Sequence, residues 1–303
     1  MTVSRRQIRL GIVGAAVFAA MAFGWWKWDQ ARRFSDIHTL LTRFPVEDAI
    51  VLNIDFASVR RAGLLTGSKA PLEPEYKQFL DGTGFDYHRD LDTVTASFSK
   101  SGNFFVARGR FDWAKLRDYA AQQGGSCYDQ LCRMQGSQPE RRISFLPLRD
   151  DTMALAVSTD DLAANRLTKQ GSAIKAEIPA APVWVLVPGA ALHDASAFPP
   201  GLRMMLSALT NADRLVVTVG LSGTVLAATM DATCRTKDDA HLLASQLRVV
   251  TANLKEAVAN DPAAQSDELV KVLAGGTFDD AGMRVSGEWP LSKALIAGLT
   301  SGI

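Results

Sequence analysis

A strand, a tight turn, a second strand and a helix follow one another in the first half of the chain. Residues 93–98 and 104–107 carry apolar side chains at strand spacing, and Ser101 and Gly102 stand between them. Two such runs joined by a short Ser/Gly stretch are typical of a β-hairpin. Asp112 then predicts a helix N-cap, and Gly124-Gly125 predicts the end of that helix. Its predicted buried stripe consists of Trp113, Leu116, Tyr119 and Ala120.

The same order of elements returns in the second half of the chain. Residues 215–219 and 225–228 predict strands on either side of Ser222-Gly223, and Thr236 precedes a predicted helix over residues 237–260. The apolar stripe of this helix is broad enough to cover a sheet; it consists of Leu242, Leu243, Leu247, Val250, Leu254 and Val258. The repeated order of elements indicates an internal duplication.

Two tandem modules of antiparallel sheet covered by helices, an α+β fold, are therefore predicted. The boundaries are residues 1–34 for an N-terminal membrane segment, 35–175 for the first module and 176–303 for the second. The first module also has a predicted strand at 49–55, short helices at 56–62 and 74–80, a hairpin turning on Asp150-Asp151, and a helix from Ser158 to Lys169 with capping-box-like spacing. The second has a strand at 183–187, helical stretches at 200–209 and 266–273, a turn at Asp279-Asp280, a strand at 283–289 and a last helix from Pro290.

Residues 10–26 contain no charged side chain, and they lie between Arg9 and Lys27. As a helix they would cover about 25 Å, slightly less than the hydrocarbon core of a bilayer. Trp25, Trp26 and Trp28 suit the membrane interface. We expect a signal anchor that stays on the chain; the rival interpretation is a cleaved signal peptide with Ala20-Met21-Ala22 as its small-residue site. In both cases the flanking arginines favour an extracytoplasmic, periplasmic location for the remainder, with the anchor in the cytoplasmic membrane.

The formal net charge of +1 excludes a large field of one sign over the 303 residues. Nucleic-acid binding is disfavoured, because a domain that contacts phosphates normally has a basic surplus.

Four side chains that can bind metals occupy alternate positions at Asp86, His88, Asp90 and Asp92. In an extended strand they would all lie on one side, where they would suit zinc or a hard divalent cation. If Asp86 caps a helical turn after Gly84, the four point in different directions and the segment is a cap, a turn and the start of a strand. Both interpretations are open at this stage.

Cys127 and Cys132 are spaced so that a disulfide could close a short hairpin, and two free thiols are the alternative. Cys234 has no partner in this pairing, and the simplest interpretation is a small buried apolar residue.

The segments Gly84-Phe85-Asp86, Asp90-Leu91-Asp92 and Gly109-Arg110-Phe111-Asp112 resemble a loose group of uncharacterised bacterial envelope proteins with one N-terminal membrane segment and a two-module α+β extracytoplasmic region. The resemblance covers most of the first module. It implies this architecture and no catalytic residue.

Motifs of common enzymes are absent from the sequence. Ser97 and Lys100 match a Ser-x-x-Lys pattern, but both fall on the predicted hairpin and no Lys-Thr-Gly follows. There is no Gly-x-Ser-x-Gly, no phosphate-binding loop and no His-Glu-x-x-His, so we expect no cofactor. The first hypothesis is a non-enzymatic, membrane-anchored envelope protein that presents a binding surface to a protein partner. The alternatives are an extracytoplasmic enzyme, using acids of the 86–92 segment or Asp279-Asp280 between the modules, and a small-molecule or lipid-binding module with an apolar pocket beneath the long helix.

Overall fold

The computed structural model describes residues 37–45, 48–65, 74–136, 140–171, 177–193, 209–222 and 225–292. The predicted membrane segment, the helical stretch 200–208 and most of the predicted last helix lie outside the described residues. Among the helices that are described, none is both long and apolar enough to cross a membrane.

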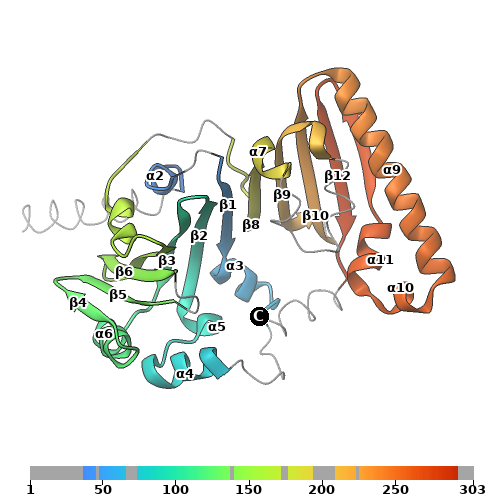
Figure 1. The fold of residues 1–303 in the computed structure, drawn as a ribbon. Helices are drawn as coiled ribbons and strands as arrows, with labels where there is room; N and C mark the ends of the chain where they lie inside the picture. The colour runs from blue at the N-terminus through green and yellow to red at the C-terminus, as the bar shows by residue number, and fades with distance from the viewer. Residues whose placement is uncertain are drawn as a thin grey trace, which may run out of the picture. The chain divides into compact units, whose positions relative to one another are not determined.

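The described part of the chain forms an α+β fold with a large antiparallel sheet, as the sequence predicts (Figure 1). Its strands are β1 (Ile50–Asp55), β2 (Leu91–Ser99), β3 (Gly102–Gly109), β4 (Ser126–Tyr128), β5 (Leu131–Gln135), β6 (Arg142–Arg149), β7 (Thr152–Ser158), β8 (Val183–Pro188), β9 (Ala212–Ser222), β10 (Val225–Cys234), β11 (Thr277–Ala281) and β12 (Arg284–Pro290). The helices are α2 (Ile37–Leu41), α3 (Phe56–Arg61), α4 (Pro74–Thr83), α5 (Tyr87–Asp90), α6 (Trp113–Gln122), α7 (Gly189–Leu192), α9 (Lys237–Asn260), α10 (Pro262–Ser266) and α11 (Glu268–Ala274), with 3-10 turns η1 (Ala163–Thr168) and η4 (Leu209–Asn211).

The chain divides into two compact units. One consists of Met1–Phe44 with Gln170–Ala176, and it contains α2. The other consists of Pro45–Lys169 with Glu177–Ile303, and it contains the whole sheet.

The strand order is symmetric about its middle, and we refer to its two halves as the first and second copy. It runs β11-β12-β10-β9-β8-β1-β2-β3-β7-β6-β5-β4, so that outward from the β1–β8 pair the order β1-β2-β3-β7-β6 matches β8-β9-β10-β12-β11. A helix follows the third strand of each copy, α6 after β3 and α9 after β10. Strands of both predicted modules thus join in one sheet through β1 and β8, which pair antiparallel with Leu52 opposite Val185.

The two copies differ in the elements after the third strand. In the first copy α6 has 10 residues, and the added hairpin β4–β5 extends the sheet beside it. In the second copy α9 has 24 residues and is followed by α10 and α11. At 1.5 Å per residue the two helices are about 15 Å and about 36 Å long, so they cover different lengths of strand.

Three predicted elements are wrong in detail. The helix expected from Ser158 begins only at Ala163 and is a 3-10 turn; Ser158 ends β7, where its hydroxyl donates to the carbonyl oxygen of Ser101 and accepts from the backbone N–H of Asp160. Asp279 and Asp280 lie inside β11, and the turn falls at Gly282, whose φ of +64° is easy for glycine. Pro290 ends β12, where it lies opposite Ala227, so no helix begins there.

The stripe of α9 also differs from the predicted one. Its buried residues are Ala240, Leu243, Ala244, Leu247 and Thr251, and the four apolar ones pack in one core cluster with residues of β10, β11 and β12. Leu242, which the sequence pattern placed in the stripe, is 47% exposed. Ala240 and Ala244 are fully buried in this cluster, whereas Leu242, between them in the sequence, is on the exposed side of the helix.

Candidate functional site

An apolar pocket of about 360 Å³ lies on the sheet of the first module. Its floor is made by Val94 of β2, Phe105 and Ala107 of β3, and Leu155 and Val157 of β7, which share one face of the sheet. The remaining lining residues are Phe79 of α4, Leu116 of α6, Leu91 of β2, Met153 of β7, and Phe85 and Phe111 of the loops. Every lining residue is apolar, and several of them are only half-buried. We call this the first-module pocket.

Helix α6 covers only part of this face of the sheet. Leu116 and Ala120 of α6 are buried in a cluster with Cys132 of β5, Phe145 of β6 and Met153. The cluster therefore lies toward the β5–β6 side of the sheet. Val94 and Phe105, nearer the middle of the sheet, are left half-buried.

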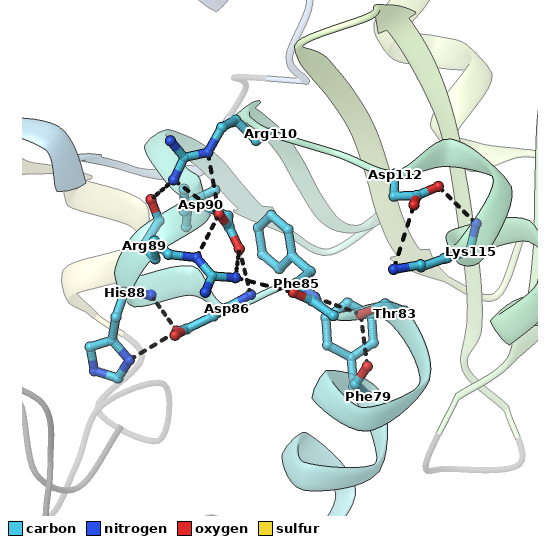
Figure 2. Close-up of polar contacts among 12 residues, drawn as sticks. Phe79, Thr83, Phe85, Asp86, His88, Arg89, Asp90, Arg110, Asp112 and Lys115 are labelled. Carbon is cyan, nitrogen blue, oxygen red and sulfur yellow. Dashed lines mark hydrogen bonds and ion pairs between the residues drawn. The ribbon is translucent and has the colours of Figure 1, made fainter.

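One end of the pocket carries a cluster of charged side chains centred on Asp90 (Figure 2). Asp90 follows the loop of Phe85 and directly precedes Leu91, and its side chain is 10% exposed. Its carboxylate accepts hydrogen bonds from Arg89 at 2.9 Å, from Arg110 at 3.0 Å and from the backbone N–H of Asp86 at 3.0 Å. Two guanidinium groups therefore share one carboxylate, and both are mostly exposed, at 65% for Arg89 and 68% for Arg110.

The three segments that carry the sequence resemblance meet at this cluster. Arg110 donates to the backbone oxygen of Arg89 as well as to Asp90, and Arg89 contacts the carbonyl of Gly84. Gly84 has φ +71°, and a Cβ on Gly109 would contact the carbonyl oxygen of Asp90. The glycines thus allow the close approach of backbone that brings residues 20 positions apart together. Sequence reasoning missed the shared use of Asp90 by two arginines, although Arg110 lies within one quoted motif and Arg89 directly precedes another.

The four candidate metal ligands have different neighbours. Asp86 caps α5 by accepting from the backbone N–H of His88 at 3.0 Å, as the second interpretation of this segment expected. The His88 ring stacks on Tyr87, and its Nδ1 lies 3.3 Å from Asp86. Asp92 pairs with Arg60 at 3.1 Å. Within the described ranges, no group of three or more His, Cys, Asp or Glu side chains is arranged to hold a metal ion.

The electrostatics of the cluster keep Asp90 ionised. The hydrogen bond from Arg89, aided by that from Arg110 and by the backbone N–H of Asp86, lowers the pKa of Asp90 from 3.8 to about 2. Beside it, burial raises the pKa of Tyr76 to about 12, so this hydroxyl stays protonated. A carboxylate with so low a pKa is a weak base, and it does not act as an acid near neutral pH.

The other candidate catalytic residues form contacts that stabilise the fold or are exposed at a turn. Ser97 is fully buried and donates to the carbonyl oxygen of Pro45 at 2.6 Å, whereas Lys100 is exposed at the turn. Asp280 pairs with the exposed His241 and with Arg248, each at 3.2 Å, and these bonds lower the pKa of Asp280. Asp280 lies on β11 at the edge of the sheet, so the enzyme hypothesis, which placed Asp279-Asp280 between the modules, does not fit this position.

Cys127 and Cys132 lie opposite each other on β4 and β5 and form a disulfide, while Cys234 is a buried free thiol. The disulfide links the two strands of the β4–β5 hairpin, which has no counterpart among the described residues of the second copy. Closing so short a loop stabilises the folded state by about 2 kcal/mol.

The disulfide predicts how many cysteine thiols are free before and after reduction. The same measurement tests whether the protein is in an oxidising compartment. Alkylation of the denatured, unreduced protein from cells should modify Cys234 alone, and reduction should expose three thiols. Peptide mass spectrometry measures both states. Modification of Cys127 and Cys132 before reduction would contradict the disulfide and the oxidising location together.

The chain matches no protein-family model and no curated protein sequence. Among solved structures it is similar to crystal form III of TP0453, with a TM-score of 0.50 and 10% identity over 87% of this chain and 98% of that chain. Crystal form I of TP0453 has a TM-score of 0.47 and 10% identity over 88% of this chain and 98% of that chain. At this identity the likeness is one of fold alone, the antiparallel α+β arrangement described above.

Proposed function

We propose that the protein is a non-enzymatic, membrane-anchored protein of the bacterial cell envelope, and that it presents the first-module pocket to a protein partner. The observation that carries the proposal is the half-buried apolar floor of this pocket, with Val94 and Phe105 at its centre. Apolar surface left open on a folded module is typical of an interaction site.

Three further observations support this function. The predicted segment 10–26 would anchor the chain in the cytoplasmic membrane, with the modules on the periplasmic side. The disulfide suits an oxidising compartment. The lowered pKa values of Asp90 and Asp280 suit ion pairs better than general acid catalysis, where a raised carboxyl pKa is needed.

A site-specific crosslink tests the proposal. A photoreactive phenylalanine analogue at Phe105 should, on illumination of cells, give a reproducible adduct with one protein in the membrane fraction. The same analogue at Val249, an exposed apolar position on α9, serves as the control and should not give that adduct. Absence of any protein adduct specific to Phe105 would reject the partner.

The pocket also favours a second candidate function, the binding of a small apolar molecule or lipid. Its volume lies within the range of about 300–1,000 Å³ that ligand pockets have, and its lining offers no polar group. Its place differs from the one expected, since it lies in the first module and not beneath the long helix. In the same experiment this function predicts an adduct of low mass at Phe105.

A further inference from the structure

The two edge strands of the sheet, β11 and β4, are held in place by different means (Figure 1). Strand β11 is fixed by helix α9. Its Phe278 is buried in the core cluster, and Arg248 of α9 donates to the carbonyl oxygen of Phe278 at 2.9 Å. Arg248 also pairs with Asp280 of the same strand at 3.2 Å. Apolar packing and polar contacts thus both join this edge to a helix.

Strand β4 has much less support from side chains. It pairs with β5 over three residues, all of them exposed, and Tyr128 is 77% exposed. Its start is held at α6, where the N–H of Gly125 donates to the carbonyl oxygen of Ala120. Beyond that point, Ser126 accepts only a long hydrogen bond of 3.5 Å from Arg133 of β5. Because so short a strand pairing is weak, the disulfide is the main support of β4.

Strand β5 is held independently on its other side. Cys132 is 1% exposed and packs in the cluster with Leu116 and Ala120 of α6 and Phe145 of β6. Strand β5 also pairs with β6 along residues 132–135. If the disulfide opens, β5 therefore stays in the sheet and β4 is the strand that is freed.

The two sulfur atoms of the disulfide differ in access, because Cys127 is exposed and Cys132 is buried. A thiolate of a dithiol reductant attacks Sγ of Cys127; the bond to Cys132 breaks, and Sγ of Cys132 keeps the electron pair and takes up a proton. The second thiol of the reductant loses its proton, attacks the reductant's sulfur in the mixed disulfide and releases Cys127 as a thiolate, which is then protonated. The hairpin gains two electrons and two thiols, and the reductant leaves as a disulfide.

We infer that the Cys127–Cys132 disulfide is a redox latch at the edge of the sheet. In an oxidising compartment the latch is closed, and it holds β4 over the edge of β5. Reduction by a dithiol frees β4 and uncovers the backbone groups of residues 131–133 that face it. An uncovered strand edge can pair with an extended segment of another chain. None of these residues lines the first-module pocket, so the inference does not rest on the proposed function.

Hydrogen exchange of the full-length protein in detergent, followed by peptide mass spectrometry, tests the latch. Dithiothreitol is the dithiol, and no denaturant is added. After reduction the amides of residues 126–133 should exchange about tenfold faster or more, because the constraint of the closed loop is lost. Residues 277–290, at the opposite edge, are the internal control and should exchange at an unchanged rate. Reoxidation should restore the protection.

Three results would overturn the inference. The first is an unchanged exchange rate in residues 126–133 after reduction. The second is a disulfide that dithiothreitol does not reduce in the folded protein. The third is faster exchange throughout the sheet, residues 277–290 included, because the disulfide would then stabilise the whole fold and not one edge strand.

A cysteine variant tests the same opening without a reductant. Cys127→Ser removes the exposed sulfur and leaves Cys132 in its cluster, so residues 126–133 should exchange fast with or without dithiothreitol. Cys234→Ala is the matched control, since it removes the buried free thiol and keeps the disulfide, and it should respond to dithiothreitol as wild type does. If Cys127→Ser were as protected as the oxidised wild type, the backbone pairs alone would hold β4 and the latch would be rejected.

Discussion

Replacing Leu243 by alanine is expected to lower the free energy of unfolding by about 3 kcal/mol, whereas the same change at Leu242 should cost less than about 0.5 kcal/mol. The two leucines are neighbours on α9, but Leu243 is fully buried and Leu242 is 47% exposed. Leu243 packs in the cluster that joins α9 to the second module's sheet, so its truncation leaves a cavity there. Truncation of the exposed Leu242 side chain leaves no such cavity.

Urea unfolding of the full-length protein in detergent measures both values. Tryptophan fluorescence is a suitable signal, because Trp289 is buried in the same cluster. The comparison is internal, since residue type, helix and helix propensity are the same for the two variants. If both variants lost a similar amount of unfolding free energy, or if Leu242→Ala lost more, the result would contradict the orientation of α9 on the sheet.

Asp90→Asn is expected to destabilise the protein by about 2 kcal/mol at neutral pH. The change keeps the size of the side chain but removes the negative charge that Arg89 and Arg110 share. Because the Asp90 side chain is only 10% exposed, water replaces these bonds poorly. The variant should also loosen the loop of Phe85 and Arg89 at the end of the pocket.

The effect of this substitution should depend on pH. The folded-state pKa of Asp90, about 2, lies below its usual 3.8, so the ionised carboxylate stabilises the folded state fully above about pH 4. The stabilisation is lost as the pH falls from about 4 toward 2. The difference in unfolding free energy between wild type and Asp90→Asn should therefore shrink over this window.

Asp112→Asn is the matched control for this pH series. Asp112 caps α6, a role that asparagine fills equally well, and its pair with Lys115 is exposed. The control should remain within about 0.5 kcal/mol of wild type at every pH. A constant difference for Asp90→Asn down to pH 2.5 would refute the assignment of the lowered pKa to this ion cluster.

Elements with a local physical cause were predictable from the sequence. The Ser101-Gly102 turn has apolar runs on both sides. Helices α6 and α9 directly follow their N-caps Asp112 and Thr236, whose side chains accept from backbone N–H groups of the first turn. The repeated order of strands and helices was also visible, because strand patterns, turn residues and helix caps follow one another in the same order in both halves. Short-range sterics and hydrogen bonds decide such features, and neighbouring residues supply both.

Features that depend on distant partners were predicted poorly. Ser158 has the spacing of a helix cap, but its hydroxyl bonds to Ser101, 57 positions away, and η1 begins later. Asp279-Asp280 has turn composition, but Asp280 is bound by Arg248 and His241 of α9 and remains in a strand. Of the candidate site, the sequence singled out Asp90 and the Arg110 segment separately and could not show that they meet.

By itself the sequence determined the α+β class, the repeated strand–turn–strand–helix order and the positions of most caps and turns, because these depend on periodicity and on contacts within a few residues. Only the tertiary structure decided that β1 and β8 join the copies in one sheet and that α6 packs toward β5 and β6. It also decided that Val94 and Phe105 remain half-buried and that Arg89 and Arg110 share Asp90. These outcomes depend on which helix reaches which strand, and that depends on packing between residues far apart in the chain.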